Sequence, residues 1–442
     1  MAATRQIETD VVVVGSGPGG ATVALRLAAA GRRVVVLEKG RADQWLGSYV
    51  GALRYVDRGG LLFTEEGLNM VRAITTGGCT IIYCGTATEP PPWLKERYGI
   101  DLGPYAREII TELHLEPLPD EACGAPALRL LEAANGLGYH WTKLRKFIDP
   151  AKCKLTCGGT CMLGCRHGAK WTAREYLEEA ERQGAEVVTR ADVLRVLHAD
   201  GVATGVSAVT PAGMLEVRAG TVIVAAGGLG TPVILQRSGI DEAGVGMFVD
   251  PLVMVAGVGK ERGTWYGPPM SVGTYEMIDE GVLLSNLIDP WAMHVIMTGL
   301  AAPRRLPQTL RFRNTFGIMV KIGDERRGVI SVDGRISKPL SERDRRRLNR
   351  GIAVAEEILQ RAGCDPRTLV VGPVRGAHPG GTARIGEVVD HDLQTRLRNL
   401  YVCDTSVIPE ALDLPTVLTV IAFARRLAEH LLARGPRRRA AA

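Results

Sequence analysis

Four cysteines at a constant spacing of four residues are the first side chains in this sequence that could do chemistry. They lie in the stretch CKLTCGGTCMLGCRHGAKWT and are Cys153, Cys157, Cys161 and Cys165. Clustered thiols in a chain that does not read as a secreted disulfide scaffold indicate metal binding or redox chemistry. Their C-x3-C-x3-C-x3-C spacing differs from the common bacterial run for a 4Fe–4S cluster, and the intervening glycines favour an irregular loop. A cluster, a structural zinc ion and uncoordinated thiols all stay open.

A second chemical signal is the glycine-rich turn GSGPGG, in which Gly15, Gly17 and Gly20 have GxGxxG spacing. Such a turn lets a pyrophosphate approach the backbone at a helix N-terminus, and an acidic residue after the next strand, here Glu38, binds an adenosine ribose. The elements expected to position these residues are a buried strand at 10–15, a helix at 21–31 and a second buried strand at 32–40. The sequence therefore predicts a dinucleotide-binding unit, without choosing between FAD and NAD.

Further glycine-rich segments follow along the chain. They are TTGGCTIIYCGTA (75–87), TVIVAAGGLGTPVILQRSGI (221–240), AHPGGTARIG (377–386) and NLYVCDTSVIP (399–409). The second of them begins as a buried strand and continues as a helix, and the last is followed by a long amphipathic helix.

These segments, in this order, resemble the glucose–methanol–choline (GMC) flavin oxidoreductases over essentially the whole chain. The resemblance implies FAD as the cofactor. It also implies flavin contacts for Gly77 and Gly78 in the second turn, for Asp404 after the last strand, and for the backbone of Thr416 and Val417. Gly228 and Asp241 depart from the residues usual in the family signature.

The fold class implied by the resemblance is α/β, with a Rossmann-like FAD-binding domain and a sheet-rich α+β substrate domain. The substrate region is indeed rich in strand-forming Val, Met and Tyr. We expect the FAD-binding domain at 1–90, 151–245 (including the cysteine loop) and 376–434, a connecting segment at 91–150, the substrate domain at 246–375 and a disordered tail at 435–442.

His378, in the HPGG segment, matches the histidine that in this family takes the hydroxyl proton while hydride passes to the flavin. Imidazole suits this task because its ordinary pKa lies near neutrality. The family normally adds an Asn or His just before the last helix, but here Leu414 and Pro415 occupy that place, with Asp413 beside them. This departure casts doubt on simple alcohol oxidation. A replacement partner could come from the substrate region, where His294, Tyr266 and Tyr275 are weak candidates.

The resemblance also bears on the cysteines. Cys161 and Cys165 belong to the pattern of many family members, whereas Cys153 and Cys157 extend it as in short microbial relatives with a ferredoxin-like cysteine run. Of the open alternatives we favour a 4Fe–4S cluster on all four, because a one-electron carrier could pass electrons on from a flavin. Structural zinc or ordinary thiols are the alternatives.

The rest of the sequence excludes several classes. The net charge of +6 comes from scattered arginines and lysines without interleaved aromatics, which argues against nucleic-acid binding. No signal peptide and no transmembrane run is evident, so we expect a soluble cytoplasmic protein, with an oligomer possible.

The sequence thus predicts an FAD-dependent dehydrogenase that oxidises a hydrophobic alcohol and passes electrons through the cluster to an acceptor protein or a quinone. Three alternatives stay open, and a plain FAD oxidase with structural cysteines is one of them. Another is desaturation or reduction of a C–C bond, or oxidation of another C–H bond, in the same fold. The third is an electron-transfer flavoprotein subunit without a small substrate of its own.

Overall fold

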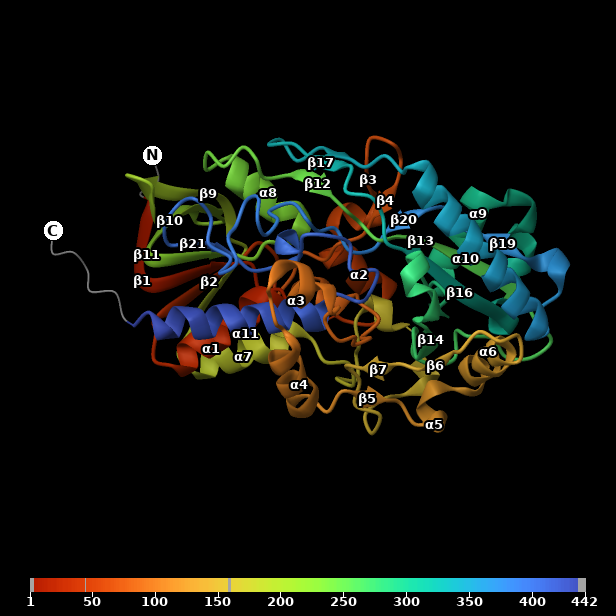
Figure 1. Cartoon of the computed structure of the whole chain (residues 1–442). Helices are drawn as coiled ribbons and strands as arrows, with labels where there is room; N and C mark the ends of the chain where they lie inside the picture. The colour runs from red at the N-terminus through yellow and green to blue at the C-terminus, as the bar shows by residue number, and fades with distance from the viewer. Residues whose placement is uncertain (1–3, 44, 158–159, 436–442) are drawn as a thin grey trace.

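The computed structural model describes residues 4–43, 45–157 and 160–435. Two large sheets, placed at opposite ends of the molecule, dominate this part of the chain (Figure 1). Residues 436–442 of the predicted tail lie outside the described residues. The predicted fold class, a Rossmann-like unit joined to a sheet-rich unit, is confirmed.

The first sheet has seven strands in the described residues, with a parallel part built around β1 and an antiparallel meander at one edge. In order across the sheet they are β8 (Glu186–Thr189), β2 (Val34–Glu38), β1 (Arg5–Val14), β11 (Gly213–Val224), β10 (Val202–Thr210) and β9 (Asp192–Ala199), with β21 (Leu400–Val402) beside β11. Val11 to Val14 and Val34 to Leu37 are buried, as strands covered on both faces require. β1 starts earlier than the valine run suggested because it pairs with β11 from Arg5 onward.

Helices cover this sheet and carry the segments around the glycine turns. α1 (Pro18–Ala29) packs between α7 (Ala173–Arg182) and α11 (Val417–Ala433). The described helices of the first half of the chain are, besides α1 and α7, α2 (Tyr49–Tyr55), α3 (Trp93–Tyr98), α4 (Gly103–Glu112), α5 (Asp120–Cys123) and α6 (Ala125–Asn135). The later ones are α8 (Gly227–Gln236), α9 (Trp291–Ala301) and α10 (Glu342–Arg361).

The second sheet has nine strands in the described residues. Across the sheet they are β3 (Leu62–Phe63), β4 (Asn69–Met70), β20 (Arg375–Gly376), β13 (Pro251–Val258), β16 (Thr315–Ile322), β15 (Val282–Asn286), β14 (Val272–Thr274) and β6 (Thr142–Lys143), with β19 (Val370–Val371) beside β13. α10 and α6 pack on one face through Val253, Val255 and Val320. The other face carries the side chains of the candidate site. β3, β4 and β6 join this sheet from outside 246–375, and the predicted domain boundaries stay predictions.

Small strands and one long 3-10 segment complete the structure. The strands are β12 (Val245–Met247), β17 (Gly328–Ile330) and β18 (Ile336–Ser337) in one sheet and β5 (Glu116–Pro117) and β7 (Arg145–Lys146) in another, and the 3-10 segment is η6 (Pro303–Asn314). Among the described residues, no helix combines the length and hydropathy needed to cross a bilayer.

Candidate active site

The predicted ribose-binding carboxylate, Glu38, ends β2 and is buried. It accepts hydrogen bonds from Ser16 N (3.0 Å), Ser16 Oγ (2.6 Å) and Gly40 N (2.6 Å). Burial raises the pKa of Glu38, and these three donors partly offset that rise. The carboxylate is therefore held in place at the edge of the sheet where a GxGxxG unit binds its ribose.

The first two glycine turns lie against each other, although about 60 residues separate them in sequence. Gly77 N donates to Ser16 Oγ at 3.2 Å, and Gly78, with φ of +55°, lies against Gly17. A Cβ on Gly17 would meet no atom within 4 Å, whereas one on Gly20 would lie 2.0 Å from Gly15 O. The turn at Gly17 thus leaves open space at the N-terminus of α1, which suits a pyrophosphate.

Two C-terminal segments complete this surface. Asp404 follows β21 and accepts hydrogen bonds from Gly227 N at 2.8 Å and from the hydroxyl of Thr231. Thr416 precedes α11, whose first residue is Val417, and α11 packs on α1. The structure therefore brings the glycine turns, Glu38, Asp404 and the start of α11 to one region, and these residues fit a bound FAD.

The HPGG segment is fixed beside the same region. Pro379 O accepts a hydrogen bond from Thr405 Oγ1 at 2.7 Å, next to Asp404. Gly228 lies so close that a Cβ there would stand 2.0 Å from Pro379 O. His378 is therefore anchored to the turns of the cofactor half, while β20 just before it belongs to the second sheet.

His378 forms a polar chain with two buried residues that the sequence did not single out. Its Nδ1 lies 2.9 Å from Asp250 Oδ2, and the same oxygen lies 3.0 Å from Lys321 Nζ. The Asp250 and Lys321 side chains are 0% and 1% exposed, whereas that of His378 is 28% exposed. Of these three residues, His378 is the one whose side chain is partly exposed to solvent.

The charges of Asp250 and Lys321 influence the protonation states of this three-residue series. Burial alone would raise the pKa of Asp250, but the ammonium of Lys321 and the hydrogen bond to His378 bring it below its ordinary value. Burial and the charge of Lys321 lower the pKa of His378, against the opposing effect of Asp250. The His378 imidazole is therefore neutral. Its Nδ1 donates a hydrogen bond to the Asp250 carboxylate, and its Nε2 is left as an acceptor.

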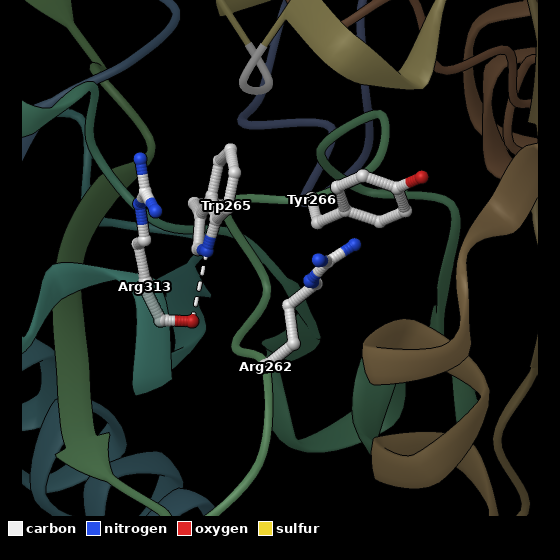
Figure 2. Close-up of a pocket in the computed structure, with 4 residues that line it drawn as sticks. All are labelled: Arg262, Trp265, Tyr266 and Arg313. Atoms are coloured by element: carbon white, nitrogen blue, oxygen red, sulfur yellow. Dashed lines mark hydrogen bonds between the residues drawn. The ribbon is translucent and has the colours of Figure 1, made fainter.

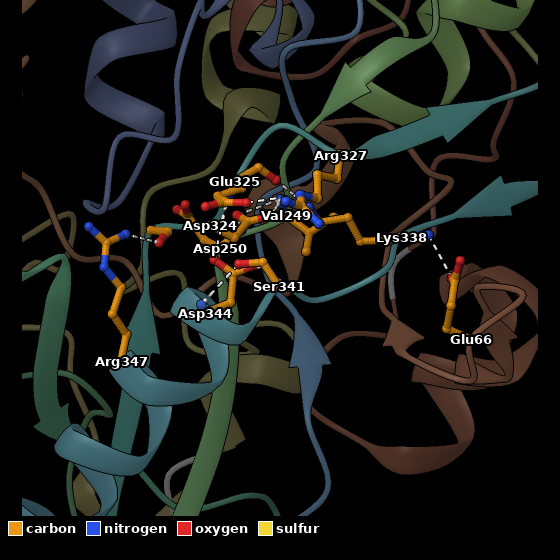
Figure 3. Close-up of polar contacts among 11 residues, drawn as sticks. Glu66, Val249, Asp250, Asp324, Glu325, Arg327, Lys338, Ser341, Asp344 and Arg347 are labelled. Carbon is orange, nitrogen blue, oxygen red and sulfur yellow. Dashed lines mark hydrogen bonds and ion pairs between the residues drawn. The ribbon is translucent and has the colours of Figure 1, made fainter.

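A second buried ion pair supports the first (Figure 3). Asp324 accepts from the backbone N–H groups of Val249 (3.1 Å) and Asp250 (2.9 Å), and pairs with Lys338 at 2.6 Å. Asp250 has a φ of +46°, a conformation that is rare outside glycine. Asp324 thus holds the backbone on which the Asp250 carboxylate is presented.

An apolar cluster lies on the same face of the second sheet as Lys321. Its buried core is Met254, Met270, Leu283, Leu287 and Met319, and partly buried neighbours include Leu252, Tyr275, Met162, Cys84 and Leu414. The Tyr275 hydroxyl is buried and has no hydrogen-bond partner among the described residues. Leu414, which stands where the family has Asn or His, contributes only apolar surface here.

The four cysteines do not form a recognisable metal site. Among the described residues, no group of three or more His, Cys, Asp or Glu side chains is arranged to hold a metal ion. Gly158 and Gly159 in the middle of the run lie outside the described residues. Cys161 is buried, while Cys153 and Cys165 pack at the edge of an apolar cluster around Ile148. The thiols thus do not fit a metal cluster as they are placed.

The sequence contains a signal for the Asp250–Lys321 pair in the strand around Lys321, although nothing in it links the two residues. Lys321 is the only charged residue in β16, whose sequence is TFGIMVKI. A lysine inside such a strand must be paired when it is buried. Its partner, 71 residues away, could not be identified from spacing.

Comparisons with known proteins agree with this geometry. Two family models described as GMC oxidoreductase match residues 58–260 and 334–424, and one described as FAD binding domain matches residues 10–45. An uncharacterized GMC-type oxidoreductase of Mycobacterium tuberculosis is 31% identical, over 96% of this chain and 76% of the relative. A long-chain-alcohol oxidase of Arabidopsis thaliana is 24% identical, over 95% of this chain and 67% of the relative.

Solved structures share the fold. Pyridoxine 4-oxidase from Mesorbium loti superposes with a TM-score of 0.72 at 19% identity, covering 96% of this chain and 99% of that one. A formate oxidase of Aspergillus oryzae has a TM-score of 0.73 at 17% identity, covering 98% and 99%.

Fold and site together define an FAD-dependent oxidoreductase. The chain belongs to the GMC oxidoreductase family.

Proposed function

We propose that this protein oxidises a hydrophobic alcohol, with His378 as the general base. The observation that carries the proposal is the hydrogen-bonded series from Lys321 through Asp250 to His378, which ends in a partly exposed imidazole. Lys321 lies on the sheet face that also carries the apolar cluster around Met254 and Met319. When bound, FAD supplies the hydride acceptor for the carbon that carries the hydroxyl group.

His378 would take the hydroxyl proton at Nε2. Asp250 accepts the Nδ1 hydrogen bond and so selects the tautomer in which Nε2 is free to accept. Because burial lowers the pKa of His378, the imidazole is neutral, and therefore able to act as a base, at physiological pH. Lys321 keeps the Asp250 carboxylate ionised in a buried site.

The proposed substrate class follows from the apolar cluster around Met254 and Met319. Its methionine and leucine side chains favour an apolar chain or ring system. The unpartnered Tyr275 hydroxyl would bind the substrate oxygen, in place of the Asn or His that this chain lacks. The long-chain-alcohol oxidases among the relatives support an apolar alcohol.

The test is anaerobic mixing of the FAD-loaded protein with primary alcohols of increasing chain length, followed by flavin absorbance. We expect bleaching that becomes faster with chain length and does not occur with sugars. Bleaching by no alcohol, but only by compounds with a C–C bond to desaturate, would overturn the proposal. If only a partner protein reduced the flavin, the electron-transfer alternative would hold. Slow reoxidation of the bleached flavin by oxygen, with fast reoxidation by a quinone, would identify a dehydrogenase.

A second candidate function concerns the cysteine run as a carrier of these electrons. Lys146 and Lys170 lie buried beside it, and Lys170 Nζ donates to Cys161 O at 2.8 Å. A 4Fe–4S cluster on four thiolates is an anion, which two buried ammonium groups would favour. Binding would require residues 153–165 to rearrange, and no step of alcohol oxidation is derived through the cluster. About four irons per FAD in anaerobically purified protein, lost in Cys157→Ser, is the expected result. Absence of iron after anaerobic reconstitution would exclude the cluster.

A further inference from the structure

α9 buries polar side chains and exposes apolar ones, which is the opposite of an ordinary surface helix. In WAMHVIMTGLA the two buried residues are His294 and Thr298, four positions apart on the inner face. Its exposed residues include Trp291 (50% exposed), Ile296 (58%) and Leu300 (69%). Surface helices normally bury the apolar face and expose the polar one. This outward apolar face therefore indicates a surface that something apolar covers.

The segment that follows α9 adds positive charge to the same surface. Residues 291–314 contain four arginines and no acidic residue. The arginines are Arg304, Arg305, Arg311 and Arg313, all exposed. Among the described residues, neither Arg304 nor Arg305 has an ion-pair partner. Leu310, between the two arginine pairs, is 85% exposed.

The loop around Trp265 extends this surface (Figure 2). Trp265 Nε1 donates to Arg313 O at 2.9 Å, and the guanidinium of Arg262 lies 4.5 Å from the centre of the Tyr266 ring. These four residues line a pocket of about 340 Å³. Glu261, the acidic residue beside them, is paired with Arg129. Tryptophan, tyrosine and arginine together are the side chains that proteins place at the headgroup level of a bilayer.

The apolar surface also continues onto α2. Ala292 N donates to Tyr49 Oη at 3.1 Å, which joins the start of α9 to α2. Val50 and Leu53 on α2 are each 67% exposed. Two helices from distant parts of the sequence, each with exposed apolar side chains, are thus joined at the start of α9.

We infer that α9, η6 and the 262–266 loop dock onto an anionic lipid surface, with the apolar side chains among the acyl chains and the arginines at the phosphates. Charge favours lipid over a second copy of this chain. A two-fold interface sets the same patch against itself, and would bring the unpaired arginines of both copies together. Anionic lipids supply the missing counter-charge.

The position of α9 suggests that docking on lipid would serve to deliver an apolar substrate to the active site. Leu287, in the apolar cluster around Met254 and Met319, lies only four residues before Trp291, where α9 begins. A bilayer at α9 would therefore lie close to this cluster and to the proposed active site, so that an apolar alcohol or quinone dissolved in the bilayer need not cross water. This use rests on the proposed function, whereas the docking itself does not.

The test is cosedimentation of the full-length, FAD-loaded chain with vesicles, using two double variants. The vesicles are phosphatidylcholine alone, or phosphatidylcholine with phosphatidylglycerol. We expect binding to the anionic vesicles that weakens with salt. Arg304→Gln with Arg305→Gln should reduce the partition about 30-fold, and Leu300→Ser with Leu310→Ser about tenfold or more.

Matched controls lie in the cofactor half. Arg218→Gln with Arg237→Gln removes the same charge, and Val209→Ser with Met214→Ser removes exposed apolar side chains from the β10–β11 hairpin. Both should bind vesicles like the unaltered chain, and flavin content verifies folding of every variant. No binding to either vesicle at low salt would overturn the inference, as would equal loss in the control variants. A dimer on size exclusion that Leu300→Ser with Leu310→Ser dissociates would assign the surface to a second copy instead.

Discussion

The two halves of the molecule stabilise their buried carboxylates by different means. In the cofactor half, Glu38 and Asp404 accept hydrogen bonds from backbone N–H groups and hydroxyls in nearby turns. Burial raises the pKa of both carboxyls, and the hydrogen bonds they accept partly offset that rise. In the substrate half, two of the buried carboxylates are paired with lysines, in the pairs Asp250–Lys321 and Asp324–Lys338.

The difference corresponds to what each half must do. A site for an anionic dinucleotide needs neutral donors, and turns supply them locally. A site that receives a proton needs a base whose partner stays ionised, and at Asp250 the charge of Lys321 favours the ionised carboxylate in a buried place. Breaking one of these ion pairs is therefore expected to lower the free energy of unfolding more than removing a hydrogen bond to Glu38 or Asp404.

The largest effect is expected from breaking the Asp250–Lys321 pair. Asp250→Asn leaves a buried ammonium without a counter-charge, which should lower the free energy of unfolding by about 3–5 kcal/mol. Urea unfolding measures this. The double variant Asp250→Asn with Lys321→Met should lose less than Asp250→Asn alone, because it removes both charges. Asp10→Asn, in an exposed pair with Arg33, should cost at most about 1 kcal/mol. Additive losses in the double variant would show that the two charges do not depend on each other.

The charges around Asp250 and Lys321 should also make the stability of the protein depend on pH. Burial, followed by the charge of Asp250, raises the pKa of Asp413 to about 7 from an ordinary value of 3.8. The folded chain thus binds a proton that the unfolded chain releases, and this carboxyl destabilises the fold increasingly as pH rises through that interval. Asp413→Asn should gain stability over the unaltered chain between about pH 5 and pH 8, up to about 4 kcal/mol.

Denaturant unfolding at several pH values tests this expectation. Asp333→Asn is the control, because the pKa of the exposed Asp333 is lowered and its charge does not change in the interval. A stability difference for Asp413→Asn that is the same at every pH would contradict the assignment.

A moderate effect is expected in the cofactor half. Glu38→Gln replaces one acceptor oxygen by a donor that faces Ser16 or Gly40, which should cost about 1–3 kcal/mol in FAD affinity. Fluorescence titration of the apoprotein with FAD measures the dissociation constant. Unchanged FAD affinity would show that the carboxylate organises the turn without contributing to binding.

The smallest effect is expected at Tyr275. Tyr275→Phe removes a hydroxyl without a protein partner, so stability should stay unchanged while kcat/KM falls about 5- to 10-fold. A fall in stability with unaltered kcat/KM would make Tyr275 a structural residue only.

The sequence predicted the cofactor half better than the substrate half. The turns around Gly17 and Gly78 and the position of Glu38 are patterns of neighbouring residues, which a short stretch of sequence contains. The polar series at His378 could not be predicted in this way, because Asp250 lies 128 positions from His378 and 71 positions from Lys321 in the sequence. The pairing of β13 with β16 and β20 brings these residues together. The reversed polarity of α9 was not predicted, because periodicity alone does not say which face is buried.

The most direct test of the central claim is the anaerobic rate of flavin reduction by a reactive alcohol in His378→Ala, measured by stopped flow. Without the base, the rate should fall about 10²- to 10⁴-fold at unchanged FAD content. The unaltered protein should gain rate with pH up to the lowered pKa of His378 and then level off, because only the neutral imidazole accepts a proton. A His378→Ala rate within about threefold of the unaltered protein, with the same pH profile, would contradict the role of His378 as base.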